Sequence, residues 1–409
     1  NTQTMLWCVL LGLVALATGK ESTNITFDVV VPSYYPVEER LDKILSLHAP
    51  PSVTVSWFVV FDKRSDNMRL SDKWFDRWNS ERVKFIFNEV NIGASGSRNV
   101  GFDAGSGDWV IYIDDDVTPD PDLIYGYLDE VRKVGNSPPP GFAGVVKFPD
   151  PQTTFHSAIE ASGMTQFYDK ASYKDTLFWA VTANICVNRK LLSTHGVRFI
   201  EDFPKGGGGE DVAFGYQIIR ATGKRFVCAK GALAVHPWWR GRSYLRFFRW
   251  GYGDSLLYSM FPEYSSVRSP NLAELLLFCI VFFFVAILLG HANNIKRALL
   301  WMLSLSFAAL FDHFIVLGNK GPEWSLFHAL EVLLIQTSYE IGTLIGIVYN
   351  LNFLSLSHVM TGHMDGEINY VSHNCLYLVL VYHAITVYWK DSRPAIFAKF
   401  FVRSKERTD

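Results

Sequence analysis

The chain has 409 residues, of which 49% are hydrophobic and 15% aromatic, and its formal net charge is −2. This length allows one sizeable domain and a further region, while the near-neutral charge without a basic tract argues against a nucleic-acid-binding protein. The 5 cysteines are scattered without Cys-x-x-Cys spacing, which indicates neither a disulfide framework nor a zinc site.

A short apolar run lies near the N-terminus, at residues 5–18. Its length of about 14 residues is short for a bilayer span and typical of a signal-peptide core. Two interpretations of residues 1–22 stay open, a cleaved signal or a short membrane helix with Lys20 on the cytosolic side, and we favour the helix. The glycosylation sequon at Asn24 has meaning only if the region is lumenal, and we interpret it as chance.

Apolar strands alternate with helices across residues 23–239. Strands are expected within 27–36, 53–61, 83–87, 109–113, 142–148, 178–192 and 226–239. Helices are expected within 36–47, 71–82 and 95–105, after residue 121, in the later part of 178–192 and after residue 210. This alternation predicts an α/β domain with a mostly parallel sheet.

Three consecutive carboxylates end the strand at 109–113, namely Asp114, Asp115 and Asp116. The carboxyl ends of buried strands are where α/β sheets bind ligands. Because alternate residues of an extended chain point the same way, we expect Asp114 and Asp116 to converge on one hard cation while Asp115 points elsewhere. Mg²⁺ and Mn²⁺ prefer carboxylate oxygens and are often shared with substrate phosphates. The plain alternative is an acidic surface turn.

A second acidic site, Glu210 and Asp211, follows a run of glycines at 206–209. Such a run gives a flexible loop that can close over a ligand. Capping explains the two acids as well, since carboxylates favour the start of a helix. A carboxylate beside a closing loop is also well placed to act as a general base.

Two further polar residues follow strands. Asp62 comes directly after the strand at 53–61, where nucleotide-binding α/β folds often place the partner of a ribose hydroxyl or a base edge; alone, it is equally explained as a turn residue. His236 comes near the end of 226–239 and is either a third metal ligand or a satisfied core histidine.

Residues 240–268 form a basic, aromatic and amphipathic stretch. This composition fits a helix in the membrane interface, whose arginines either meet phosphates or only anchor the helix. The arginines of this stretch include Arg240, Arg242, Arg246 and Arg249.

A membrane region is expected at 269–390. The candidate spans are about 272–290, 298–318, 325–350 and 368–389. Four spans return the chain to the side on which it entered, and the basic tail at 391–409 places that side in the cytosol. We therefore expect a multi-pass membrane protein with a cytosolic soluble domain, the alternative being a lumenal domain after a cleaved signal.

Ionisable residues inside these spans are costly and suggest either function or pairing within the bundle. They are Asp312, His313, Glu331 and Glu340. A position near an interface would also explain such residues, and for Glu331 we favour an interface position or a pair inside the bundle over a functional role.

As a set, these motifs resemble a known family. The segments VVVPSYYP, NIGASGSRN, DDDVTPDP and GGGGED, together with Asp62, are similar in order and spacing to the family 2 inverting glycosyltransferases, over residues 27–255. RFFRW at 246–250 and the C-terminal helices resemble the membrane-embedded branch, which includes hyaluronan, cellulose and glucosylceramide synthases. The implied fold is an A-type, mostly parallel nucleotide-sugar-binding sheet, then an amphipathic interface helix and a bundle of about four transmembrane helices.

The resemblance implies a donor-binding role for several residues. Pro32, Ser33 and Tyr34 match positions that border the base and ribose. Asp62 matches the residue that binds uracil or an equivalent base, and Arg98 lies near the diphosphate.

The resemblance also implies a metal and a base. Asp114 and Asp116 form the DxD pair, with Asp116 the firmer ligand of Mn²⁺ or Mg²⁺, and His236 matches a position that binds the metal in some members. Asp211 is the expected base that deprotonates the acceptor hydroxyl, with Glu210 beside it.

Arg249 and Trp250 match the end of the QxxRW motif of processive synthases and are assigned with Arg246 to the donor site. This sequence departs from the motif, since Arg246 occupies the glutamine position. The departure argues against a polymer-making enzyme.

The sequence therefore predicts a membrane-integral, metal-dependent inverting glycosyltransferase that uses a nucleotide sugar, with UDP as the expected nucleotide, and a lipid or membrane-proximal glycan acceptor. The alternatives are a processive polysaccharide synthase that translocates its product and an inactive transferase-like scaffold or transport protein. Membrane lipids are expected partners and nucleic acid is not.

Overall fold

The computed structural model describes residues 25–63, 70–135, 137–268, 270–318 and 325–360. Contacts divide the chain into two compact units. The first unit comprises residues 1–151 and 165–241, and the second comprises 152–164 and 242–409.

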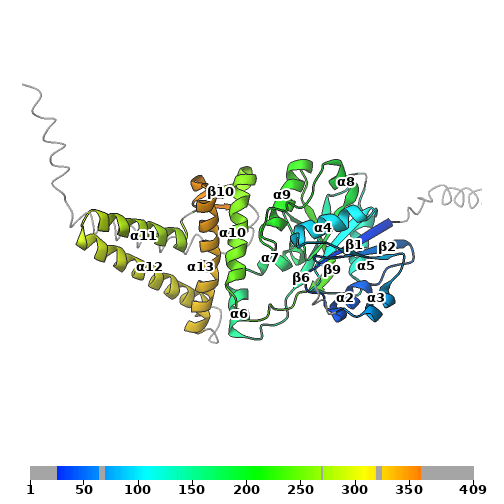
Figure 1. Cartoon of the computed structure of the whole chain (residues 1–409), viewed down its shortest axis with the longest axis horizontal. Helices are drawn as coiled ribbons and strands as arrows, with labels where there is room; N and C mark the ends of the chain where they lie inside the picture. Colours follow the sequence, from blue (N-terminus) through cyan, green and yellow to red (C-terminus); the bar gives the residue numbers. More distant parts are fainter. Residues whose placement is uncertain (1–24, 64–69, 136, 269, 319–324, 361–409) are drawn as a thin grey trace, which may run out of the picture. The chain divides into compact units, whose positions relative to one another are not determined.

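The first unit is built on one large sheet (Figure 1). Its strands are β1 (Ile25–Ser33), β2 (Val53–Phe61), β3 (Val83–Phe87), β4 (Trp109–Ile113), β5 (Thr118–Pro119), β6 (Gly141–Lys147), β7 (Thr176–Leu177), β8 (Asn184–Asn188) and β9 (Phe226–Val235). The strand order is β3-β2-β1-β4-β8-β6-β9-β5, and β7 pairs with β9. The expected α/β class is confirmed.

The sheet is mixed, which corrects the expectation of a mostly parallel one. Strand pairs β1–β2, β1–β4, β2–β3 and β6–β9 are parallel. Strand β8 runs antiparallel to both β4 and β6, and β5 and β7 run antiparallel to β9. A central strand buried on both faces is a continuous apolar run whichever way it points, so the sequence pattern predicted the strands and not their directions.

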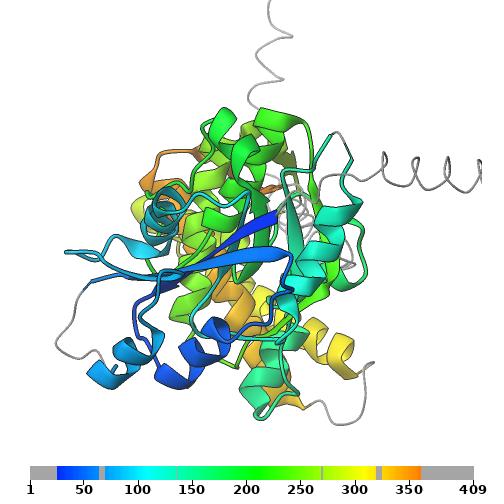
Figure 2. The same ribbon diagram turned by 90° about the vertical axis from the view of Figure 1, so that its right-hand side faces the viewer.

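Helices cover both faces of this sheet (Figure 1 and Figure 2). They are α2 (Glu38–Leu45), α3 (Asp72–Trp78), α4 (Gly93–Ala104), α5 (Leu123–Lys133), α7 (Gln166–Asp169), α8 (Arg189–Thr194) and α9 (Glu210–Thr222). Alternate strand residues enter two separate cores: Val29 and Ile111 pack with α2, α3 and α5, whereas Val30 and Tyr112 pack with α4, α8 and α9. The second core anchors the helices that carry the polar residues described below.

The second unit is mainly helical. Its elements are α6 (Thr154–Ala161), α10 (Leu245–Met260), β10 (Ser265–Val267), α11 (Leu272–Leu288), α12 (Ala292–Gly318), α13 (Leu326–Tyr349) and β11 (His358–Met360). Helices α10 and α13 approach closely through glycine, since a Cβ on Gly342 would lie 2.0 Å from the Phe248 carbonyl oxygen. Small residues allow two helix backbones to come this near.

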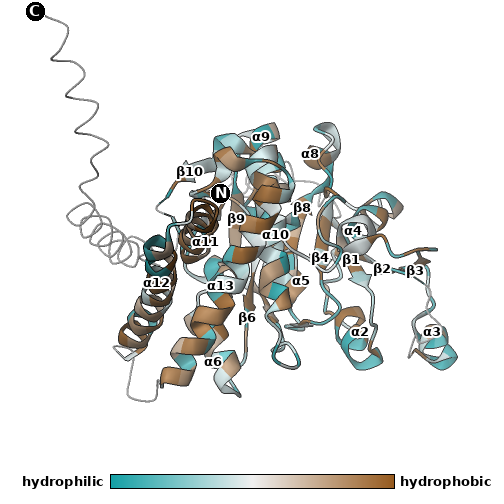
Figure 3. Ribbon diagram, turned by 60° about the vertical axis from the view of Figure 1, so that its left-hand side comes forward, coloured by the Kyte–Doolittle hydropathy of each residue, from teal (hydrophilic) through white to brown (hydrophobic). Residues whose placement is uncertain are grey.

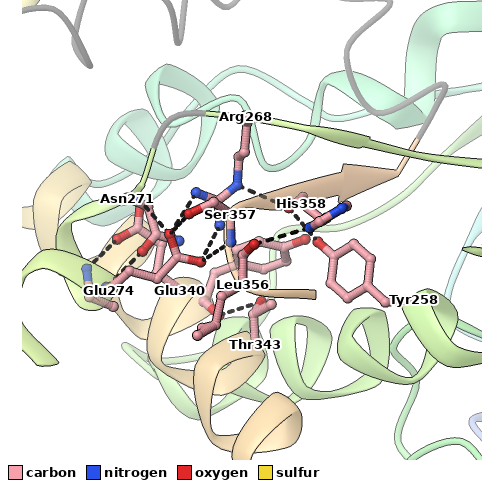
Figure 4. A network of polar contacts seen from close by, with 11 residues as sticks. Tyr258, Arg268, Asn271, Glu274, Glu340, Thr343, Leu356, Ser357 and His358 are labelled. Atoms are coloured by element: carbon pink, nitrogen blue, oxygen red, sulfur yellow. Dashed lines mark hydrogen bonds and ion pairs between the residues drawn. The ribbon is translucent and has the colours of Figure 1, made fainter. Parts of the chain in front are cut away.

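A buried polar network ties the ends of these helices together (Figure 4). Arg268 forms an ion pair with Glu274 at 3.0 Å. The backbone N–H of Ser357 also donates to Glu274, at 2.8 Å. Glu340 accepts from the backbone N–H of Ala273 at 3.2 Å, at the first turn of α11. These contacts fasten the start of α11 to α13 and to the segment before β11.

The ionisable side chains of the candidate spans have partners. Glu331 pairs with Arg242 at 2.8 Å and accepts from the Tyr244 hydroxyl. His313 lies 2.6 Å from Gln336 Oε1. Pairing inside the unit therefore accounts for Glu331 and His313, which removes the reason to assign them a separate function.

Among the described residues, two helices are long and apolar enough to cross a membrane, α12 with 27 residues and α13 with 24. The sequence predicted about four. Helix α11 has 17 residues and is shorter than a span because it ends before Gly290, whose φ of +69° leaves the helical region. The span expected at 368–389 and the apolar run at 5–18 lie outside the described residues. Length and composition alone qualify α12 and α13, and the core helix of a soluble protein qualifies equally.

Candidate functional site

The candidate site of the first unit lies at one edge of the sheet. Strand β1 pairs in parallel with β2 and β4, so the residues at their carboxyl ends share this edge, namely Ser33, Asp62 and Asp114. Strand β9 pairs with β5 through Val235 and Thr118. This pairing brings His236, the residue after β9, near Asp116, which lies just before β5. The strand register thus explains why residues distant in sequence meet here.

Arg98, on α4, is a buried cation that faces the carboxylates of two segments. Its Nη2 donates to Asp114 Oδ1 at 2.8 Å, and its Nη1 lies 3.8 Å from Glu210 Oε1. The side chain is only 3% exposed. Burial opposes the charged form of Arg98, yet its pKa is raised because the charges of Asp114, Asp211 and Glu210 outweigh burial. The strand-end carboxylate and the acids of α9 therefore meet around one guanidinium.

Glu210 begins α9 and is buried. Gly208 donates its backbone N–H to Glu210 Oε2 at 2.6 Å. The loop reaches this position through Gly207, Gly208 and Gly209, whose φ values of +89°, +133° and +88° favour glycine. Burial, followed by the neighbouring charge of Asp211, raises the pKa of Glu210 to about 7, against the effect of Arg98. The environment of Glu210 thus favours its protonated form.

Asp211 is held by a residue that the sequence did not single out. The Thr182 hydroxyl donates to Asp211 Oδ1 at 2.7 Å, and the Thr182 backbone N–H donates to Oδ2 at 3.2 Å. Burial raises the pKa of Asp211, while Arg98 and Thr182 act in the opposite direction. Thr182 precedes β8 by two residues and belongs to no motif, so only the folded contact identifies it.

The three consecutive aspartates contact different partners. Asp114 pairs with Arg98, and Asp115 accepts a hydrogen bond from the Ser33 hydroxyl. Burial raises the pKa of Asp115 to about 7, and the Ser33 contact lowers it. Asp116 Oδ2 lies 3.6 Å from His236 Nε2. The structure therefore brings Asp116 together with His236, and Asp114 together with Arg98.

His236 is enclosed by aromatic rings and is 4% exposed. Its ring centroid lies 5.1 Å from that of Phe148, 5.6 Å from Tyr168 and 5.3 Å from Trp239. Within the described part of the chain, no group of three or more His, Cys, Asp or Glu residues is arranged to hold a metal ion. Asp116 and His236 form a two-residue pair.

Asp62 is buried at the start of α4. Its carboxylate accepts from the backbone N–H groups of Ile92 and Gly93, both at 2.8 Å, and from the Asn88 side chain at 3.2 Å. Carboxylates are favourable at this end of a helix because the first N–H groups lack partners there. Asp62 thereby joins the end of β2 to the helix that carries Arg98.

The remaining predicted donor residues differ in exposure. Pro32 is buried in β1, whereas Tyr34 directly after β1 is 46% exposed and lies against the exposed ring of Tyr35 with centroids 4.5 Å apart. Arg246, Arg249 and Trp250 lie on α10, in the second unit.

Comparison with known proteins finds similarity in the N-terminal half of the chain. The model of the family described as Glycosyl transferase family 2 matches residues 29–195. The amylovoran biosynthesis glycosyltransferase AmsB of Erwinia amylovora is 27% identical over 94 residues, which are 23% of this chain and 31% of that protein. An uncharacterized glycosyltransferase of Haemophilus influenzae is 33% identical over 88 residues, 22% of this chain and 28% of that protein. The chain thus matches less than a third of the length of each relative.

Two solved structures are similar at lower identity. The mannosyltransferase PcManGT of Pyrobaculum calidifontis, in complex with GDP-Man and Mn²⁺, is 16% identical with a TM-score of 0.48, covering 79% of this chain and 87% of that one. Residues 1–349 of S. aureus TarS, in complex with UDP-GlcNAc, are 16% identical with a TM-score of 0.41, covering 57% and 66%. The family match and the two curated relatives show that residues 29–195 are similar to family 2 glycosyltransferases.

Proposed function

We propose that this chain is a membrane-integral, metal-dependent inverting glycosyltransferase. It moves a sugar from a nucleotide sugar, with UDP as the expected nucleotide, to a lipid or membrane-proximal glycan acceptor. The observation that carries the proposal is the meeting of the strand-end carboxylate Asp114 and the α9 acid Glu210 around Arg98. A glycosyltransferase needs two kinds of group close together. The groups near Asp114 serve the leaving diphosphate, and the acids of α9 serve the incoming hydroxyl.

Asp116 and His236 are the proposed ligands of a divalent cation, together with Asp114. The Asp116 carboxylate and the His236 imidazole come from separate elements and lie 3.6 Å apart. Such a small set of protein ligands fits Mn²⁺ or Mg²⁺, whose remaining coordination positions are often filled by water and substrate phosphate. Asp114 is held by Arg98, so Asp116 is the firmer ligand. The cation, when bound, stabilises the charge on the departing diphosphate.

Asp211 is the proposed general base. In the transfer step it takes the proton from the acceptor hydroxyl, whose oxygen forms a bond to the anomeric carbon. The bond from that carbon to the diphosphate breaks, and the nucleoside diphosphate leaves with the electron pair. Attack opposite the leaving group inverts the anomeric configuration. The base must be ionised for this step, so its contacts with Arg98 and Thr182 matter.

The donor nucleotide is proposed to lie over the ends of β1 and β2. The exposed ring of Tyr34 supports this placement because an exposed aromatic face offers a base a surface to stack on. Pro32, Ser33 and Asp62 border the same edge, and Arg246, Arg249 and Trp250 stay proposed donor residues from α10.

Membrane integration is proposed from the second unit. Large apolar side chains are exposed along α11 and α12, and Figure 3 shows these helices coloured mainly as hydrophobic. They include Phe278, Val281, Phe284, Leu300, Leu303 and Phe307. Exposed apolar surface of this extent is typical of contact with lipid or a partner.

The metal claim is tested by UDP binding to the purified chain with and without Mn²⁺. Mn²⁺ should tighten UDP binding in the natural protein. Asp116→Ala should weaken the Mn²⁺-dependent part of this binding at least about 10-fold, because mutation of a residue that only contacts a metal ligand already lowers metal affinity by that factor. Asp129→Ala, an exposed aspartate on α5, is the matched control and should bind like the natural protein. Equal UDP affinity with and without Mn²⁺ would remove the cation from the proposal.

A further inference from the structure

Thr182 supplies two hydrogen bonds to a single carboxylate. Its hydroxyl and its backbone N–H reach different oxygens of Asp211, at 2.7 Å and 3.2 Å. Thr182 is 2% exposed, so water does not replace these contacts readily. The adjacent Glu210 is held instead by Gly208 of its own loop, at 2.6 Å. Each acid at the start of α9 thus has a separate support.

We propose that Thr182 is a positioning residue for Asp211, which fixes the orientation of this carboxylate and favours its ionised form. The inference rests on the proposed function, in which Asp211 accepts the proton of the acceptor hydroxyl. Two donors from one residue restrict rotation of the carboxylate. Threonine is suited to this task because its β-branched side chain is stiff about χ1. A hydrogen bond to the charged form of an acid favours that form.

The charges around Asp211 make such support necessary. Burial is the largest effect and raises the pKa of Asp211. Asp114, from the segment after β4, raises it further, and Glu210 lies next to it in the chain. Arg98, from α4, and the two Thr182 bonds act in the opposite direction. Removal of the hydroxyl therefore shifts Asp211 toward its protonated form, in which it is no longer a base.

The test variant is Thr182→Val, which keeps the shape and the backbone N–H but lacks the hydroxyl. Loss of a hydrogen bond to a charged group should lower kcat about 10- to 100-fold, with little change in KM for the donor. The acid limb of the pH–rate profile should move to higher pH. Thr182→Ser retains a hydroxyl and should recover much of the loss.

Thr222→Val is the matched control. Thr222 lies at the far end of α9, where its hydroxyl donates to the Ile218 carbonyl oxygen at 2.7 Å and accepts from the Lys224 backbone N–H at 3.1 Å. This variant should leave kcat and the pH–rate profile as they are. An unchanged kcat and acid limb in Thr182→Val, in a protein that turns over its donor, would overturn the proposal.

Unfolding of the full chain in detergent gives a second measurement that needs no activity. Thr182→Val should lower the unfolding midpoint in the natural background and lower it little or not at all beside Asp211→Ala, because the partner is already gone. Equal shifts in both backgrounds would refute the Thr182–Asp211 contact. Failure of the proposed function is recognised by a different result. In that case the natural protein releases no nucleotide from any donor.

Discussion

Arg98 is the residue on which the charges of the first unit converge. It is the buried guanidinium beside Asp114, Glu210 and Asp211. One cation does not neutralise three carboxylates, and desolvation disfavours their charged forms. Burial and the charge of Asp211 accordingly raise the pKa of Glu210 to about 7, which favours its protonated form.

This raised pKa predicts a pH-dependent contribution to stability. At a pH below the ordinary pKa of a glutamate, Glu210 is protonated in both the folded and the unfolded chain, and its contribution to the free energy of unfolding is fully present. This stabilising contribution is lost as the pH rises through about 7. Glu210→Gln cannot ionise. Its unfolding midpoint should therefore rise relative to the natural protein by at least about 2–4 °C at pH 8 and little at pH 4.

Thermal unfolding of both proteins across this pH range provides the measurement. Glu39→Gln is the matched control, since Glu39 is exposed on α2 and forms an ion pair with Lys43 at 3.3 Å. The difference in unfolding midpoint between Glu39→Gln and the natural protein should not change with pH. A Glu210→Gln difference that is equally flat would contradict a buried, protonated Glu210.

The sequence singled out candidate acids and His236 but did not indicate which residues they contact. Spacing and motif pointed to Asp116, His236, Glu210 and Asp211, because such residues follow strands or a glycine run. Thr182 was not singled out because a lone threonine in the segment expected as a strand carries no functional signal until the segment before β8 packs against α9. The contact of Asp62 with the start of α4 likewise depends on packing between two elements.

At the scale of elements, the sequence predicted where apolar strands and helices lie better than how they pair. Strand β8 was expected, but its antiparallel insertion between β4 and β6 is set by the path of the chain rather than by its residues. Helix α13 was expected as a span, but its close contact with α10 depends on Gly251 and Gly342 facing carbonyl groups of the other helix. Such contacts between distant segments leave no local pattern.

Helices α11, α12 and α13 carry the prediction about the membrane. If their exposed apolar side chains face lipid, the full chain should stay in the membrane pellet after extraction at high salt and at alkaline pH, and detergent should release it. Apolar contact is insensitive to salt, whereas surface charge attraction is screened by it. Release of most of the protein by salt or alkali alone would contradict membrane integration.

At the scale of the whole molecule, the two units differ in composition and in the role that we propose for each. Most of the family match, at residues 29–195, lies in the first unit, as do the ion pairs of Arg98 with Asp114 and Glu210 and the contact of Asp116 with His236. The second unit contains the apolar helices and also takes in residues 152–164 from the middle of the first. The sequence separated a charged half from an apolar half, but the return of α6 to the second unit follows only from its packing against α13.

The central claim is that Asp211 serves sugar transfer from a nucleotide sugar. The most direct measurement is nucleotide release by the full chain, purified in detergent with Mn²⁺ or Mg²⁺, from a panel of UDP- and GDP-sugars. We predict metal-dependent release from one donor, lost at least about 100-fold in Asp211→Asn while UDP still binds. Release that is equal in the natural protein and Asp211→Asn would contradict the account.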